Sequence, residues 1–166
     1  MKLRAGFVFL AASAMIYAAT ASAEPNRVSK HGEWTVFTET DGGKTCFIAT
    51  IPTAQNPTSL SWAPQILITR GAITGGRNEP SIQAGYTYQE GSTVTLSIGS
   101  DSFSLFTDKD GAWVADIEPE RRVVAAMKRG SLMIIKGTSE RGNVTTDTYS
   151  LSGVTAGIKR ITQLCP

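Results

Sequence analysis

The sequence predicts an all-β fold, an antiparallel β-sandwich or flattened barrel with one short internal helix and a short C-terminal helix. Short runs of apolar and β-branched residues follow one another through most of the chain. Clusters of Gly, Asn, Asp and Ser separate these runs at intervals that suit antiparallel hairpins. Two segments depart from the period of two and carry the period of a helix.

The strand pattern is clearest at residues 93–98, where Val94, Leu96 and Ile98 share one face and hydroxyl side chains share the other. This segment predicts a strand with one buried face. The same kind of pattern predicts further strands at residues 34–37, 45–51, 65–69, 82–88, 102–106, 112–116, 132–136 and 146–151. The segments 54–64 and 71–80, which contain Pro and Gly, are predicted as surface loops.

The internal helix is expected at residues 121–128. Pro119 can stand in a first helical turn, Val124 and Met127 lie three residues apart, and Gly130 follows the end. The C-terminal helix is predicted from Val154, Ile158 and Ile161, which form an apolar stripe at positions i, i+4 and i+7.

Residues 1–23 have the pattern of a cleaved secretory signal peptide. Lys2 and Arg4 precede an apolar run, and small residues stand before a cut between Ala23 and Glu24. We therefore expect export to the periplasm or secretion, with residues 24–166 as a single domain and no transmembrane or lipid anchor after cleavage.

Cleavage also changes the charge of the chain. The full sequence has 16 Lys and Arg against 14 Asp and Glu, but Lys2 and Arg4 leave with the signal peptide, and every acidic residue lies after the cut. The balance of the mature chain is even, which argues against nucleic acid as a partner.

The two cysteines, Cys46 and Cys165, are both retained after cleavage. An even number of cysteines in an oxidising compartment usually means pairing, so we expect one disulfide that ties the C-terminus to an early strand. The alternative, a redox or metal role, has no support from C-x-x-C spacing.

The sequence offers no convincing catalytic, cofactor or metal site. The single histidine, His31, is expected to be a solvated residue near a mobile terminus, which argues against a serine or cysteine hydrolase. Ser139 lies in a segment that resembles a nucleophile elbow, but Arg141 replaces the required glycine, so a hairpin turn is favoured. Residues 108–111 lack the anchoring acids of a calcium loop and are also predicted as a turn, with weak surface calcium binding as the alternative.

A basic cluster on the internal helix and one tryptophan form the candidate contact surface. The charge could meet an anionic surface or be a solvated helix face neutralised by nearby acids. Trp62 stands in a Pro-rich loop, where an exposed aromatic side chain would mark a contact, whereas Trp34 and Trp113 are expected in or near the core. The candidate surface comprises Arg121, Arg122, Lys128, Arg129 and Trp62.

The chain from about residue 34 to 166 resembles the invasion-associated locus B proteins, a family of exported bacterial proteins known mainly from alphaproteobacteria. The resemblance rests on several short segments, of which the closing one, 147–153 followed by a short helix and Cys165, is the most specific. The other segments are 66–69, 85–86, 112–113, 124–130 and 139–142. The resemblance implies a β-rich periplasmic, surface-associated or secreted protein, linked in pathogenic relatives with invasion of host cells, and it implies no enzymatic activity.

The leading hypothesis is therefore an exported, non-enzymatic interaction protein whose partner is an unidentified protein or a component of the envelope or of a host surface. A periplasmic carrier of a small ligand or lipid is the alternative, and it would need a continuous apolar cavity between the sheets. A general envelope role in a free-living bacterium also remains open. A hydrolase without histidine is the third class.

Overall fold

The computed structural model describes residues 24–40, 43–59 and 61–166. The predicted signal peptide and Ala23 lie outside these residues, and Glu24 is the first that can be placed. In the described part of the chain, no helix combines the length and the apolar character that crossing a membrane requires.

The fold is dominated by one antiparallel sheet in the order β1-β2-β3-β5-β6-β9-β8-β7-β10-β11-β4. The sheet is not closed, because β1 and β4 form its two free edges. Its strands are β1 Asn26–His31, β2 Trp34–Glu39, β3 Thr45–Thr50, β4 Ala54–Asn56, β5 Gln65–Gly71, β6 Glu79–Gln83, β7 Thr93–Ile98, β8 Asp101–Asp108, β9 Gly111–Trp113, β10 Leu132–Thr138 and β11 Val144–Ser150.

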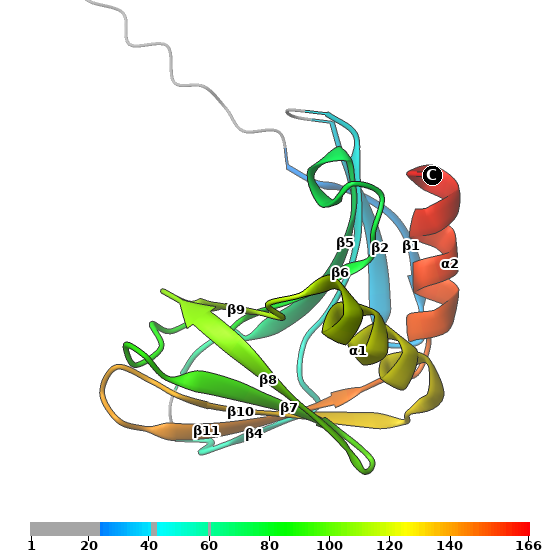
Figure 1. Cartoon of the computed structure of the whole chain (residues 1–166). Helices are drawn as coiled ribbons and strands as arrows, with labels where there is room; N and C mark the ends of the chain where they lie inside the picture. The colour runs from blue at the N-terminus through cyan, green and yellow to red at the C-terminus, as the bar shows by residue number, and fades with distance from the viewer. Residues whose placement is uncertain (1–23, 41–42, 60) are drawn as a thin grey trace, which may run out of the picture.

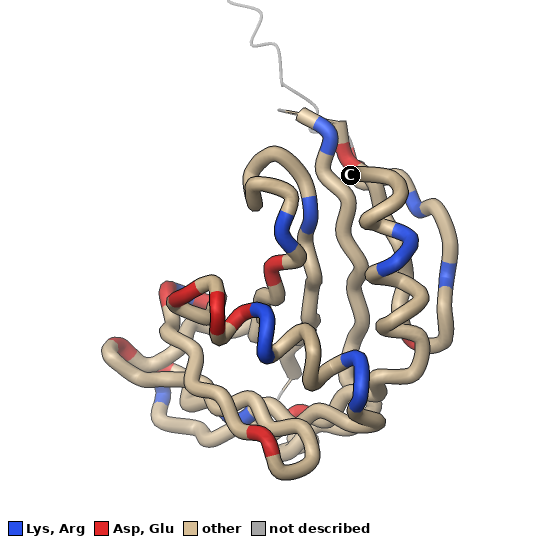
Figure 2. Tube along the Cα trace, turned by 45° about the vertical axis from the view of Figure 1, so that its right-hand side comes forward, with Lys and Arg blue, Asp and Glu red and all other residues tan. Residues whose placement is uncertain are grey.

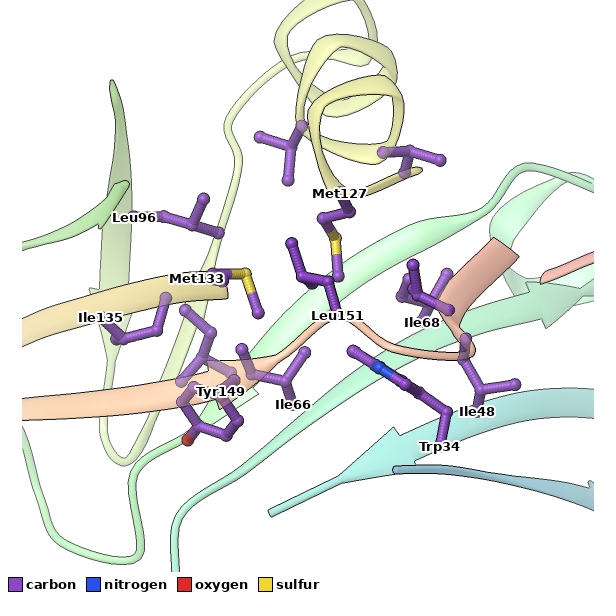
Figure 3. Close-up of a cluster of buried hydrophobic side chains, with 14 of the residues drawn as sticks. Trp34, Ile48, Ile66, Ile68, Leu96, Met127, Met133, Ile135, Tyr149 and Leu151 are labelled. Atoms are coloured by element: carbon purple, nitrogen blue, oxygen red, sulfur yellow. The ribbon is translucent and has the colours of Figure 1, made fainter. Parts of the chain in front are cut away.

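The sheet bends so that its two parts face each other. In Figure 1, β1, β2, β5 and β6 stand upright, whereas β4, β7, β8, β10 and β11 lie across the lower part of the molecule. A single core fills the space between them, and it takes Trp34, Ile48 and Ile66 from the first part and Leu96 and Tyr149 from the second (Figure 3). The prediction of an all-β fold with two packed faces is confirmed.

Helix α1, Ile117–Arg129, and helix α2, Val154–Leu164, lie where the sequence predicts helices. α1 buries Val124 and Met127 and packs on β6 and β8, and α2 packs on β1, β2, β3 and β5. The apolar stripe of Val154, Ile158 and Ile161 is buried, as its spacing predicts. Pro119 lies in the first turn of α1, where its missing N–H costs no intrahelical hydrogen bond.

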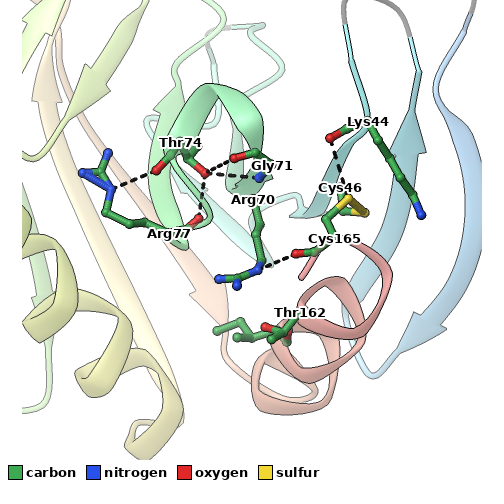
Figure 4. Close-up of a disulfide and its surroundings, with 9 residues drawn as sticks. Lys44, Cys46, Arg70, Gly71, Thr74, Arg77, Thr162 and Cys165 are labelled. Atoms are coloured by element: carbon green, nitrogen blue, oxygen red, sulfur yellow. Dashed lines mark hydrogen bonds between the residues drawn. A yellow bond between two sulfur atoms is a disulfide. The ribbon is translucent and has the colours of Figure 1, made fainter.

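α2 delivers the C-terminus to β3, and a disulfide joins Cys46 to Cys165 with their Cα atoms 6.0 Å apart (Figure 4). Both cysteines are buried. Arg70 of β5 adds a second tie, because its Nε donates to the carbonyl oxygen of Cys165 at 2.6 Å. The predicted disulfide is confirmed.

The prediction for His31 is wrong in its location. His31 does not lie in a free terminus but ends β1, which pairs with β2 in the register His31 to Trp34. The ring is half-buried and hydrogen-bonds to the Ser29 hydroxyl at 3.1 Å. The polar sequence of β1 hides this strand, since it lies at an edge and buries little of its own surface.

Three further element boundaries differ from the sequence prediction. β4 lies inside the predicted loop 54–64, and it forms because β11 offers it a partner rather than because of its own sequence. β6 begins at Glu79, inside the predicted loop 71–80, and ends at Gln83. Residues 84–88 do not continue the strand, although Tyr88 forms an isolated antiparallel bridge with Ser139. β9 is shorter than predicted, because residues 114–116 turn into α1.

Candidate binding pocket

The candidate functional site is a pocket of about 450 Å³ near the β4 edge of the sheet. Its walls come from three segments that are distant in the sequence: Ser61 and Trp62, residues 85–87, and the turn between β10 and β11. We call it the Trp62–Tyr86 pocket, after the two aromatic residues in its wall. Its volume falls within the range of small-molecule sites, roughly 300–1,000 Å³.

The aromatic side chains of the pocket are held in a fixed arrangement. The ring of Tyr86 meets Trp62 edge-on at a centroid distance of 5.4 Å and meets Tyr88 edge-on at 5.2 Å. The Tyr86 hydroxyl is hydrogen-bonded to the Thr145 hydroxyl at 2.6 Å. Each geometry is favourable for aromatic pairs, so the ring of Tyr86 has one orientation before any ligand arrives.

Two glycines allow the chain to approach these rings. A Cβ on Gly137 of β10 would lie 2.7 Å from the Tyr88 ring, and one on Gly85 would lie 2.8 Å from the backbone nitrogen of Ala63. Gly85 also has a positive φ of 73°, which other residues adopt at a cost. Side chains at these positions would push the walls of the pocket apart.

A buried carboxyl group lies behind the rings. Thr145, Asp147 and Tyr149 alternate along β11 and all face inward. Asp147 stands opposite Ile135 on β10 and opposite Gln55 on β4. Only 3% of its surface is exposed, and we call the group of Trp62, Tyr86, Tyr88, Asp147 and Tyr149 the aromatic–carboxyl cluster.

The cluster holds polar atoms that make no hydrogen bond. The Oδ1 atom of Asp147, the hydroxyl of Tyr149 and the indole nitrogen of Trp62 are buried and make no hydrogen bond of normal geometry, although the donor groups of Trp62 and Gln55 lie near the Asp147 carboxyl. Native proteins leave few such atoms unpaired, because each costs about 1–3 kcal/mol. This polar end of the core therefore adds less stability than an apolar one of the same size would.

Burial controls the ionisation of the cluster. Loss of solvation raises the pKa of the Asp147 carboxyl, and the nearby donor groups of Trp62 and Gln55 offset part of that rise. Burial likewise raises the pKa of the Tyr86, Tyr88 and Tyr149 phenols. The three phenols therefore keep their protons at physiological pH and do not act as bases.

The rim of the pocket is polar and carries both signs of charge. Glu140, Arg141 and Asn143 line it from the turn after β10, and all three are exposed. Ser139 lies in the same turn, where its buried hydroxyl accepts a hydrogen bond from the amide of Asn143 at 3.2 Å. This turn is the hairpin that the sequence predicts for residues 137–142, and its serine is held as a turn residue.

The other predicted contact residues lie on α1, apart from the Trp62–Tyr86 pocket. Arg121 and Lys128 line a second pocket between α1 and the segment after β5. Arg121 also pairs with Glu118 at 2.8 Å, whereas Arg129 pairs with Asp101 at 3.5 Å. Acidic residues stand at the start of α1 and basic ones at its end, as the helix dipole favours (Figure 2).

The remaining basic residue, Arg122, stacks its guanidinium over the Phe103 ring at 5.7 Å. Glu120, an acid on the same helix, is buried and faces Arg77 at 3.8 Å. Three of the four basic residues therefore have a partner, which is an acid for Arg121 and Arg129 and the Phe103 ring for Arg122.

Trp62 is half-buried in the pocket wall, whereas Trp34 is fully buried and Trp113 stacks against Phe106 at 5.9 Å. Among the described residues no group of three or more His, Cys, Asp or Glu side chains could hold a metal ion. The segment 108–111 forms the turn between β8 and β9, as predicted.

Of the aromatic–carboxyl cluster, sequence analysis identified only Trp62 as a candidate, although one signal for Asp147 was present. In the strand 144–150 the buried positions alternate, and this phase puts Asp147 among the inward residues. A charged residue in the buried phase of a strand is a sign of a site. The partners Trp62, Tyr86 and Tyr88 come from irregular segments and have no such pattern.

Comparison with known families decides the relationship of this chain. The family model described as Invasion associated locus B (IalB) protein matches residues 34–162. The chain belongs to the Invasion associated locus B family. No curated protein matches the sequence.

A solved member has the same fold as this IalB-family chain. The crystal structure of invasion associated protein B from Bartonella henselae superposes with a TM-score of 0.59 at 14% identity. The match covers 82% of this chain and 96% of the Bartonella chain. The expected family and its β-rich fold are thus confirmed.

Proposed function

We propose that this IalB-family protein is exported, binds its partners without catalysing a reaction, and contributes to contact between the bacterium and host cells. The single observation that carries the proposal is the family match over residues 34–162. The β-rich fold shared with the Bartonella protein is consistent with it.

Export is supported by two features that agree with each other. The first 23 residues have the charge, apolar run and small residues of a signal peptide. The buried disulfide between Cys46 and Cys165 suits an oxidising compartment, which lies beyond the cytoplasmic membrane. We place the mature chain, beginning at Glu24, in the periplasm or outside the cell.

A binding role is favoured by the chemistry of the Trp62–Tyr86 pocket. The pocket presents fixed aromatic rings and a rim of polar and charged side chains, a combination that is typical of small-molecule binding sites. The nearest serine, Ser139, has its hydroxyl engaged by a backbone amide, and His31 belongs to β1 and does not line the pocket. Nucleophilic catalysis needs a nucleophile next to a base, and these residues do not provide that pair.

The alternative of an apolar-ligand or lipid carrier finds less support. Such a carrier needs an apolar cavity between the two parts of the sheet. In the part of the chain that the structure describes, buried side chains such as Trp34, Met127 and Leu151 occupy that space (Figure 3). The basic residues Arg121 and Lys128 remain a proposed surface for an acidic partner.

Two measurements test the proposal in the bacterium that encodes the chain. The full-length chain with a C-terminal tag should appear in the periplasmic, surface or culture-medium fraction, and N-terminal sequencing should read from Glu24. An uncleaved cytoplasmic product would refute export. A deletion strain should adhere to and invade cultured host cells less than wild type, and the intact gene should restore both.

Normal invasion by the deletion strain together with new sensitivity to detergents would instead establish a general envelope role. Turnover of a substrate by the purified mature protein, lost on a single substitution, would overturn the non-enzymatic assignment.

A further inference from the structure

We propose that the Trp62–Tyr86 pocket binds one sugar ring of a neutral glycan. This inference rests on the proposed binding function and names the chemistry of the ligand. It is carried by the combination of half-exposed aromatic rings, a polar rim of balanced charge and a volume of about 450 Å³.

A pyranose ring has two kinds of surface. Its C–H groups form an apolar face, and its hydroxyls project around the edge. An apolar face is best buried against an aromatic ring, whereas the hydroxyls need hydrogen-bond partners that replace water. The pocket supplies both, with Trp62 and Tyr86 in the wall and the polar groups of Glu140, Arg141 and Asn143 at the rim.

The rings are fixed before the ligand binds, so binding costs little conformational entropy of these side chains. Tyr86 is locked by its hydrogen bond to Thr145 and by edge-on contacts with Trp62 and Tyr88. Gly85 and Gly137 permit this close arrangement, since a Cβ at either position would clash.

Other ligand classes fit less well. A phosphate or nucleotide would need net positive charge, but Glu140 stands beside Arg141 at the rim. An organic cation would need an accessible carboxylate, whereas Asp147 is 3% exposed and does not line the pocket. A lipid chain would meet a rim of polar side chains.

The test uses the oxidised mature protein and ligand-observed NMR at millimolar concentrations of named probes. The pyranosides are methyl β-glucopyranoside, methyl β-galactopyranoside and N-acetylglucosamine. Sorbitol carries similar hydroxyls without a ring, and p-cresol imitates an aromatic side chain. We expect binding of at least one pyranoside and none of sorbitol. Equal binding of sorbitol, preference for p-cresol, or no binding of any pyranoside would overturn the proposal.

Two variants locate the binding. Trp62→Ala should weaken pyranoside binding by about tenfold or more, because the stacking surface is lost. Asn143→Ala removes a rim group from an exposed turn and should weaken binding a few-fold, whereas Asn26→Ala, on exposed β1, should change nothing. If Trp62→Ala does not fold, the two asparagine variants still test the site. Equal pyranoside affinities of Asn143→Ala and Asn26→Ala would show that the sugar binds elsewhere.

The failure of this inference differs from that of the proposed function. A strain that carries Trp62→Ala and invades normally, while the deletion strain does not, removes the pocket from the function but leaves the function standing.

Discussion

At the scale of single residues, polar groups in the core decide where this molecule departs from a plain β-sandwich. Asp147 stands between Ile135 and Gln55 in the sheet and is almost fully buried. A buried acid without full hydrogen bonding destabilises the folded state whenever it is ionised. The aromatic–carboxyl cluster is therefore expected to oppose folding.

Substitution of Asp147 by Asn tests this cost through pH. Burial raises the folded pKa of the carboxyl above its ordinary value of 3.8, so the folded state binds the proton more tightly than the unfolded state. The contribution of Asp147 to the free energy of unfolding then decreases as pH rises from about 4 through the raised folded pKa. D147N lacks this titration, and its stability relative to wild type should increase over the same range.

Urea unfolding at several pH values between about 4 and 7 measures the difference. Asp108→Asn, at an exposed position, serves as the control and should show no such trend. A constant difference between D147N and wild type across the range would contradict the assignment.

Gly153 shows a second residue-scale constraint, because it allows two turns to touch. Its φ is 95°, and a Cβ there would lie 1.9 Å from the carbonyl oxygen of His31. Gly153→Ala should therefore lower the free energy of unfolding by about 3 kcal/mol or more, through backbone strain and the clash together.

Gly142→Ala is the matched control for this prediction. Its φ of 80° is similar, but no atom lies within 4 Å of the added Cβ, so only the strain of about 1–2 kcal/mol should appear. An equal decrease in the urea midpoint of unfolding for the two variants would show that the clash with His31 adds nothing to the backbone strain.

At the scale of elements, the C-terminal helix is held by covalent and polar ties as well as by its apolar stripe. The apolar stripe of Val154, Ile158 and Ile161 faces the sheet. The disulfide and Arg70 hold the last turn of the helix (Figure 4). The helix has 11 residues, a length at which an isolated helix is marginal in water, so these tertiary contacts maintain it.

Removal of the disulfide tests how much of this support is covalent. The bond spans 119 residues of sequence, and the chain-entropy model assigns a loop of this order about 4–5 kcal/mol, often less in practice. The Cys46→Ala and Cys165→Ala double variant should unfold at a clearly lower urea concentration, and amide exchange in α2 should accelerate. An unchanged midpoint would show that the disulfide does not stabilise the fold.

At the scale of the whole molecule, the two parts of the bent sheet share one core, and the chain crosses between them more than once. The chain leaves β3, adds β4 to the far edge of the second part and returns to β5. Trp34 joins the parts directly, because its indole nitrogen donates to the carbonyl oxygen of Ser150 at 3.1 Å. We expect the two parts to unfold together.

Trp34→Phe probes this connection. The change removes a buried donor, leaves the Ser150 carbonyl without that bond and opens a small cavity, for a loss of about 2–4 kcal/mol. Circular dichroism and fluorescence should still report one coincident transition. Trp113→Phe, at a half-buried site, should cost less. Separate transitions for the two probes would mean that the parts are independent.

The sequence by itself determined the elements whose signal is local. The alternation in 93–98 predicts β7, the stripe of Val154, Ile158 and Ile161 predicts α2, and the cysteine count predicts the disulfide. These predictions succeed because side chains two, three or four residues apart decide which face is buried. The family resemblance likewise predicted the confirmed fold.

Only the tertiary structure decided the features that depend on partners far along the chain. β4 is a strand because β11 pairs with it, and Thr53 reaches Thr148 across 95 residues. The polar β1 is a strand because it pairs with β2, which follows it directly in the sequence. The Trp62–Tyr86 pocket has the same origin, since its rings come from loops that no periodicity describes. Strand pairing and pocket formation of this kind join distant segments, so no single stretch of the sequence contains both partners and predicts the interaction.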